Sequence, residues 1–190
     1  MIQNHPTFVR RYPPLYGVSR MPFTPAEIQS LLHLERHPTC GFVAETYRST
    51  TTVPAESLGA PYESTRPIGS ALYFLVTPDA HIVMHRIRSD QFYHHYLGDP
   101  LDLLMLLPDG NGKVVAVGSD LAAGMRPQVF LPGNTFHMAR LRKSGQWALL
   151  GSTEWPGVEP PDVEIADCVK LLTAYPAWRT QIEAFIGGTR

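Results

Sequence analysis

Between residues 70 and 153 the chain is made of short apolar or alternating runs that turn-forming residues separate. Many short strands, broken at close intervals by Gly, Pro, Asn and Asp, are typical of all-β barrels and sandwiches. The Asp109-Gly110-Asn111-Gly112 turn is the clearest hairpin, since Gly and Asn tolerate the left-handed backbone of tight turns. The runs expected to form strands are 71–76, 82–87, 92–96, 101–107, 114–118, 128–131, 137–142 and 147–152. The pattern predicts an all-β fold.

Helical periodicity appears only outside this β-rich segment. Thr24-Pro25-Ala26-Glu27 combines an N-cap residue, a proline at the first helical position and the glutamate of a capping box, which predicts a short N-terminal helix. The segments 166–175 and 178–186 predict two short C-terminal helices. Residues 51–67 contain several prolines and glycines and are expected to form a flexible loop, a candidate lid over a pocket.

The length of 190 residues suits one domain. Residues 1–22 show no period and are expected to form an irregular arm, with disorder as the alternative. A single domain is expected over residues 23–190. Its β-rich core would cover about 42–157 and its C-terminal helices about 164–187.

Charge and cysteine content narrow the functional classes. With 16 Lys and Arg against 17 Asp and Glu, the chain lacks the basic field that drives nucleic-acid binding. No apolar run is long enough to span a bilayer, and the first residues lack the apolar core of a secretory signal. Cys40 and Cys168 lack CxxC spacing, which favours two reduced thiols in the cytoplasm. We therefore expect a cytoplasmic protein with a small-molecule partner, and neither nucleic acid nor a membrane as partner.

Five ordered blocks of sequence resemble one known family. They are 34–49, 69–75, 85–101, 127–137 and 147–157. The block that begins at His85 resembles the first motif of the cupin superfamily, and the block that ends at His137 resembles the second. Asn134 replaces a motif glycine, a mild change because Asn tolerates a left-handed turn. The chain is similar to a largely uncharacterised cupin family related to the sugar epimerases, which implies a cupin jelly-roll β-barrel.

The resemblance also implies a partial metal site. His85 stands at the first motif histidine and His137 at the last, whereas Ile87 replaces a histidine and Gln91 replaces the glutamate. An amide oxygen contributes only a dipole where a carboxylate contributes charge, so a divalent metal held by His85, Gln91 and His137 would be bound weakly. No firmly bound cofactor is expected. Metal-free imidazoles can act as general acids or bases, as the related epimerases imply.

Strand alternation indicates which other side chains line the barrel. If Gln91 faces inward, so do Tyr93 and His95. Glu45 and Tyr47 share a face, and Arg48 points the other way. With two further polar candidates from other strands, the expected substrate-binding residues are Glu45, Tyr47, Arg48, Tyr73, Gln91, His95 and Gln128.

The leading hypothesis is an enzyme of the isomerase or epimerase type that acts on a small polar or sugar-like metabolite, in a setting such as specialised metabolism. His85 or His137 would move the proton, and Tyr93 would polarise the substrate or donate a proton. One alternative is a ligand-binding protein that has lost its chemistry, with both histidines as satisfied interior residues. Another is a metal-dependent oxygenase or lyase with a weakened metal site. The resemblance also suggests a homodimer that exchanges an N-terminal strand or arm.

Overall fold

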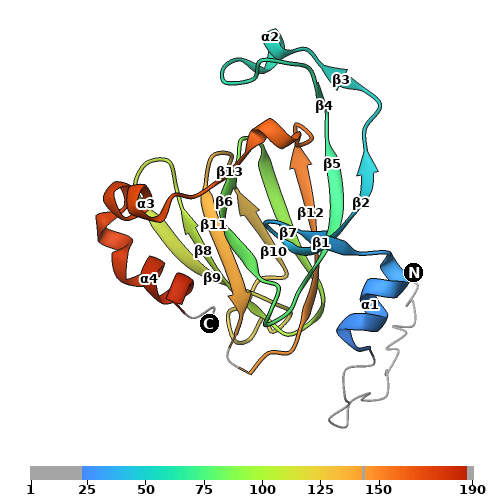
Figure 1. Cartoon of the computed structure of the whole chain (residues 1–190), viewed down its shortest axis with the longest axis vertical. Helices are drawn as coiled ribbons and strands as arrows, with labels where there is room; N and C mark the ends of the chain where they lie inside the picture. Colours follow the sequence, from blue (N-terminus) through green and yellow to red (C-terminus); the bar gives the residue numbers. More distant parts are fainter. Residues whose placement is uncertain (1–22, 143, 188–190) are drawn as a thin grey trace, which may run out of the picture.

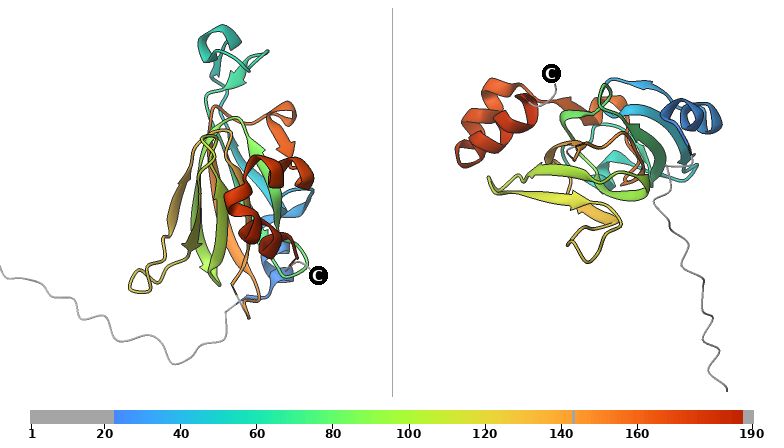
Figure 2. Two further views of the ribbon diagram at one scale, coloured as in Figure 1. Left: turned by 90° about the vertical axis from the view of Figure 1, so that its left-hand side faces the viewer. Right: turned by 90° about the horizontal axis from the view of Figure 1, so that it is seen from below.

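The computed structural model describes residues 23–142 and 144–187, and these residues form two antiparallel β-sheets that face each other (Figures 1 and 2). The strands of the six-stranded sheet are, in spatial order, β1 (Glu35–His37), β2 (Gly41–Arg48), β5 (Ser70–Val76), β12 (Ala148–Trp155), β7 (Asp90–Gly98) and β10 (Gln128–Leu131). Those of the five-stranded sheet are β13 (Val163–Ile165), β6 (Ile82–Ile87), β11 (Phe136–Leu141), β8 (Leu101–Leu106) and β9 (Gly112–Val117).

The prediction of a mainly β chain is confirmed, and each of the predicted runs overlaps a strand. A closed barrel is not formed by the described residues. Hydrogen bonding is continuous only within each sheet. Isolated bridges link Cys40, just before β2, with Ile82 of β6, and Arg126, just before β10, with Val117 of β9. Asn134 adopts the left-handed backbone expected of it, with φ of 62°.

Strand β8 separates two parts of the hydrophobic core. Leu101, Leu103 and Met105 face the space between the sheets. Leu104 and Leu106 face the opposite way, onto the C-terminal helices α3 (Cys168–Ala174) and α4 (Arg179–Gly187), which the 3-10 turn η2 (Pro176–Trp178) joins. Because both faces of this strand are covered, its sequence is almost continuously apolar instead of alternating.

The N-terminal helix α1 (Pro25–Leu32) begins as predicted. The Thr24 hydroxyl accepts a hydrogen bond from the Glu27 backbone at 3.2 Å, and the Glu27 carboxylate accepts one from the Thr24 backbone at 2.7 Å. Ile28 then packs with Leu75 and Trp147 in a smaller cluster. The predicted arm over residues 1–22 lies outside the described residues. No helix in the described part of the chain combines the length and apolar character needed to cross a membrane.

Residues 51–67 contain short elements instead of the featureless loop that was expected. Strands β3 (Thr52–Val53) and β4 (Arg66–Pro67) pair with each other, and α2 (Ala55–Leu58) lies between them in a projection beyond the ends of the sheets (Figure 1). Arg66 anchors this projection through a buried ion pair to Asp162, which ends the 3-10 turn η1 (Pro160–Asp162). The role of this segment as a lid stays a prediction.

Candidate functional site

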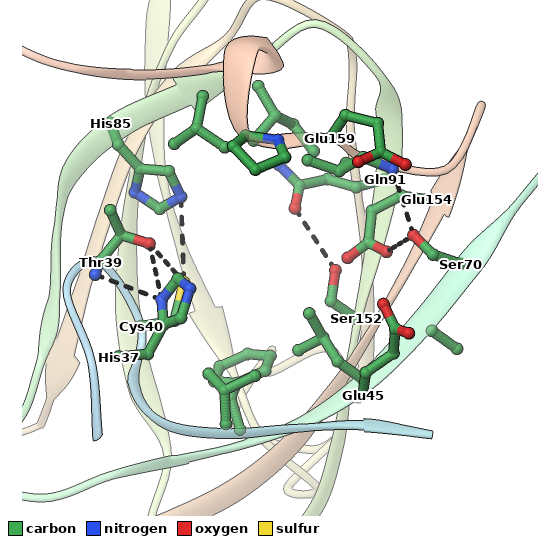
Figure 3. A pocket seen from close by; sticks show the side chains of 18 of the residues that line it. His37, Thr39, Cys40, Glu45, Ser70, His85, Gln91, Ser152, Glu154 and Glu159 are labelled. Carbon is green, nitrogen blue, oxygen red and sulfur yellow. Dashed lines mark hydrogen bonds between the residues drawn. The ribbon is translucent and has the colours of Figure 1, made fainter. Parts of the chain in front are cut away.

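A cavity of about 500 Å³ lies between the two sheets, a size that suits a small metabolite (Figure 3). Strands of both sheets, the β1–β2 turn and the segment from β12 to β13 contribute its walls. Apolar side chains supply much of the lining, including Val43, Leu72, Phe74, Ile87 and Val163. The polar and titratable lining residues are His37, Thr39, Cys40, Glu45, Arg48, Ser70, His85, Gln91, Tyr93, Ser152, Glu154 and Glu159.

His85 presents a nitrogen acceptor to this cavity. Its Nδ1 lies 2.8 Å from the carbonyl oxygen of Val83, and because a carbonyl only accepts, the proton sits on Nδ1. Nε2 is therefore an acceptor, and the Cys40 thiol donates a long, weak hydrogen bond to it at 3.9 Å. Burial lowers the pKa of His85 from 6.5 to about 4, so the imidazole is neutral at physiological pH.

His137 lies directly behind this group. It pairs with His85 across β11 and β6, and the two rings are 4.3 Å apart between centroids. Nδ1 of His137 donates to the carbonyl of Thr135 at 3.1 Å, so Nε2 accepts the hydrogen bond from the Tyr93 hydroxyl at 2.9 Å. Burial lowers the pKa of His137 well below its usual value, and the neighbouring His85 adds to this. His137 is fully enclosed, whereas Tyr93 lines the cavity.

A buried carboxyl group, Glu154, stands across the cavity from His85 (Figure 3). The Ser70 hydroxyl donates to its Oε2 at 2.6 Å. Burial raises the pKa of Glu154, and the hydroxyls of Ser152 and Ser70 beside it offset part of that rise. Beside it, the Ser152 hydroxyl donates to Oε1 of Gln91 at 3.4 Å. The two walls thus carry a neutral imidazole and a carboxyl group that keeps its proton to higher pH than an ordinary glutamic acid.

The prediction for β2 was wrong at Tyr47 and Arg48. A register shift between Glu45 and Tyr47 interrupts the pairing with β5, so the alternation reverses after Thr46. Tyr47 is left exposed, and Arg48 lines the cavity together with Glu45. Arg48 donates through Nη2 to Oε2 of Glu45 at 2.6 Å and through Nη1 to Oε1 of Glu159 at 2.9 Å.

Tyr73 and Gln128 were also wrongly assigned to the pocket. In β5 the side chains of Leu72 and Phe74 line the cavity, so Tyr73 points to the opposite face, where it packs edge-on against Tyr96 at 5.8 Å between ring centroids. Gln128 is exposed and lies opposite His94, with its amide nitrogen 3.3 Å from Nδ1 of that ring. Alternation places both residues on the outer face of the six-stranded sheet.

His95 also lies apart from the cavity. It follows Gln91 and Tyr93 at the expected spacing of two, but the cavity lining along β7 ends at Tyr93. Its Nε2 donates to the carbonyl of Asp99, in the β7–β8 turn, at 3.1 Å. This imidazole thus ties a turn to its strand and does not reach the pocket.

The metal ligands that the cupin motifs imply do not fit a divalent cation in this arrangement. The lone pair of His137 Nε2 accepts from Tyr93, and Oε1 of Gln91 accepts from Ser152. His85 Nε2 is left as the single free nitrogen donor of the set. A cation site needs several converging donors, preferably with a carboxylate, and the described residues contain no cluster of three or more His, Cys, Asp or Glu side chains arranged to hold one.

Glu154, Ser152 and Ser70 are pocket residues that sequence reasoning missed. Polar residues at alternate positions, Ser152 and Glu154, interrupt an otherwise apolar strand, and this was the available signal. Cys40 lies on the cavity wall, and burial raises its pKa to about 11. Cys40 and Cys168 are both free thiols.

Comparisons with known proteins agree with this architecture. The chain is 26% identical to a hypothetical protein from Leishmania major, with a TM-score of 0.77 over 86% of this chain and 98% of that one. It is 28% identical to protein SO0799 from Shewanella oneidensis, with a TM-score of 0.73 over 86% of this chain and 97% of that one. An uncharacterized protein of Saccharomyces cerevisiae, YML079W, is 29% identical over 124 residues, which span 61% of this chain and 62% of the yeast protein.

A family model described as Cupin superfamily (DUF985) matches residues 26–166. This segment includes the strands that carry His85, Gln91 and His137, which the sequence motifs had indicated. With two facing sheets around a lined cavity and a family match over most of its length, the chain belongs to the cupin superfamily, in the group designated DUF985.

Proposed function

We propose that this cupin is an enzyme that transfers protons on a small polar or sugar-like metabolite, in the manner of an isomerase or epimerase. One observation carries the proposal: a neutral imidazole, whose Nε2 has only the weak thiol donor of Cys40 as a partner, faces a cavity that holds a buried carboxyl group on its other wall. Two titratable groups whose environments move their pKa values in opposite directions are the usual basis of acid and base roles.

In the proposed reaction the substrate carries a carbonyl with a proton on the adjacent carbon. Nε2 of His85 takes that proton, and the electron pair of the C–H bond moves to form an enol. Glu154 gives its proton to the carbonyl oxygen at the same time. In an isomerisation, His85 returns the proton to the former carbonyl carbon, and Glu154 takes the hydroxyl proton from the neighbouring carbon as the new carbonyl forms. In an epimerisation, solvent supplies a proton to the original carbon on the opposite face, His85 loses its own proton to solvent, and the enol hydroxyl returns its proton to Glu154. Both protein groups then regain their starting states.

Tyr93 and His137 act together in this proposal. The Tyr93 hydroxyl lies at the cavity wall and donates to His137, whose ring is held in one tautomer by Thr135. Because its single proton goes to His137, Tyr93 is assigned to holding a substrate hydroxyl through its oxygen, and His137 to positioning Tyr93. Gln91, Glu45 and Arg48 are assigned to substrate binding, because all three line the cavity.

Exchange of carbon-bound protons tests the proposal directly. The protein is incubated in D₂O with a panel of aldoses and ketoses, and deuterium incorporation next to the carbonyl is followed by NMR. We expect His85→Ala and Glu154→Gln each to reduce exchange by about 10²-fold or more, the scale of general acid–base catalysis. Val169→Ala, at an exposed position on α3, serves as the matched control. Exchange at the wild-type rate in both pocket variants would contradict the proposal.

The alternative of a binding protein makes a different prediction. Its apolar wall and preformed cavity would hold a ligand without exchange of any carbon-bound proton, and binding would survive in Glu154→Gln.

We also propose a cytoplasmic homodimer. Free thiols at Cys40 and Cys168 support the compartment, and sequence resemblance supports the dimer, which sedimentation of the purified chain would test.

A further inference from the structure

Acidic groups outnumber basic ones in the cavity lining. Among the described residues that line it, two carboxylates, Glu45 and Glu159, surround Arg48, which is the single arginine or lysine. Glu154 is a third carboxyl group, but its burial raises its pKa and favours the uncharged form, so it is left out of the charge balance. The imidazole of His85 adds no positive charge at neutral pH, since burial keeps it neutral. An anionic ligand would therefore find a site in which the charges repel it.

Arg48 itself has little left to offer a ligand. Its Nε and Nη2 donate to the carboxylate of Glu45, and its Nη1 donates to Glu159. The carbonyl oxygen of Val158 lies 3.3 Å from both Nη atoms. A guanidinium that binds phosphate or carboxylate needs a free pair of parallel N–H groups, and here carboxylates of the protein occupy that pair.

Three other arginines, Arg66, Arg86 and Arg88, do not add positive charge to the cavity lining. Arg86 pairs with Glu164 at 2.6 Å and lies outside the cavity lining. Arg66 lies in the buried pair with Asp162, which Arg88 also approaches at 3.5 Å. None of these three arginines is among the described residues that line the cavity.

Hydrogen-bond acceptors face the cavity in place of charged donors. His85 is only 3% exposed, and its Nε2 has no nitrogen or oxygen partner among the described residues. Because its Nδ1 carries the proton, Nε2 acts only as an acceptor toward a ligand. Glu45 and Glu154 add carboxyl oxygens to the opposite side (Figure 3). A matching ligand must supply O–H or N–H groups.

We propose that the cavity takes a neutral or positively charged small molecule rich in hydroxyl or amino groups, and that it excludes phosphates, nucleotides and carboxylates. This inference rests on the proposed function insofar as the cavity is the substrate site. A site for a phosphorylated or nucleotide-linked sugar would need free cationic donors. In this cavity the donors of Arg48 are occupied by Glu45 and Glu159.

Cys40 allows the potential inside the cavity to be measured without knowing the ligand. It lines the cavity, whereas Cys168 is exposed outside it and serves as an internal reference. The probes are the 2-aminoethyl and 2-sulfonatoethyl methanethiosulfonates, of similar size and opposite charge. Each transfers its thioalkyl group to the thiolate and releases methanesulfinate. The high pKa of Cys40 slows both reagents equally and cancels in the ratio of their rates.

We expect Cys40 to react at least about tenfold faster with the cationic reagent than with the anionic one. This ratio of rates is first divided by the same ratio measured at Cys168. The Glu45→Gln variant, which leaves Arg48 balanced by Glu159, should bring this ratio close to one. Rates are read from peptide masses over time. If Cys40 reacts too slowly, the Cys40→Ser/Leu72→Cys variant allows the same ratio of rates to be measured at another wall of the cavity.

A normalised ratio at or below one in the wild-type cavity would overturn this inference. That result would leave proton exchange by His85 and Glu154 standing. Conversely, unchanged deuterium exchange in His85→Ala would overturn the proposed function and leave the measured potential, and the ligand class it implies, intact.

Discussion

At the scale of single residues, the pocket depends on how hydrogen bonds assign protons. Backbone carbonyls of Val83 and Thr135 hold Nδ1 of His85 and His137 in the protonated form. Both Nε2 atoms are therefore acceptors, but Tyr93 occupies one of them and the other faces the cavity. The sequence motifs give His85 and His137 similar positions, but the structure gives them different roles. Tyr93 occupies Nε2 of His137, whereas Nε2 of His85 can accept a hydrogen bond from a ligand.

The depressed pKa of His85 makes the fold sensitive to acid. In the unfolded chain this histidine takes up a proton below pH 6.5, whereas in the folded protein it does so only near pH 4. Its contribution to stability is therefore complete above pH 6.5 and is lost as pH falls toward 4. The loss amounts to about 3 kcal/mol, at 1.36 kcal/mol per pKa unit.

Urea unfolding at pH 7 and pH 4.5 measures this effect. The wild-type free energy of unfolding should fall more steeply between these two values than that of His85→Gln, which cannot take up the proton. Equal falls in the two proteins would show that His85 titrates normally in the folded state.

At the scale of elements, one buried ion pair connects the projecting 51–67 segment to the cavity rim. Arg66 is bidentate to Asp162 at 2.7 and 2.8 Å, and their side chains are 3% and 0% exposed. Burial alone would raise the pKa of Asp162, but the hydrogen bonds from Arg66 outweigh it and the pKa is lowered. Asp162 also accepts from the backbone of Glu159, which lines the cavity.

Removal of one side chain of the Arg66–Asp162 ion pair should therefore lower the free energy of unfolding substantially. Arg66→Met leaves the Asp162 charge buried beside only the more distant Arg88, and we expect a loss of about 3–5 kcal/mol in the free energy of unfolding. Arg66→Met/Asp162→Leu should recover much of that loss, because neither charge then remains. Arg179→Met breaks the exposed pair with Glu183 and should cost less than about 0.5 kcal/mol. A double variant as unstable as the single one would contradict this account.

At the scale of the whole molecule, the sheets and the C-terminal helices form one layered structure with β8 in the middle. Ile182 on α4 is fully buried and packs in the cluster that contains Leu104 and Leu106. We expect Ile182→Ala to lower the free energy of unfolding by about 2–5 kcal/mol through the cavity it leaves.

Val169→Ala is the matched control, since that side chain is 75% exposed on α3, and its effect should stay within about 0.5 kcal/mol. Both values come from chemical denaturation. A loss below about 1 kcal/mol for Ile182→Ala would indicate that the helices are not part of the cooperative fold.

Local patterns were sufficient to predict most of the elements. Alternation predicted the strands, and the Thr24–Glu27 capping box predicted the start of α1. Each of these depends on neighbouring residues or on a repeated spacing, so the amino-acid order alone contains the information. The meeting of the distant imidazoles of His85 and His137 was implied by the resemblance to the cupin motifs.

Tertiary structure decided which inward residues form the site. The register shift at Tyr47 brings Arg48 to the cavity, and the end of the cavity at Tyr93 leaves His95 beside Asp99. A register shift depends on pairing between strands, and burial depends on all the elements around a residue. For the same reason, the protons on the two histidines and the raised pKa of Glu154 follow from partners far away in the sequence, which only the folded chain brings into contact.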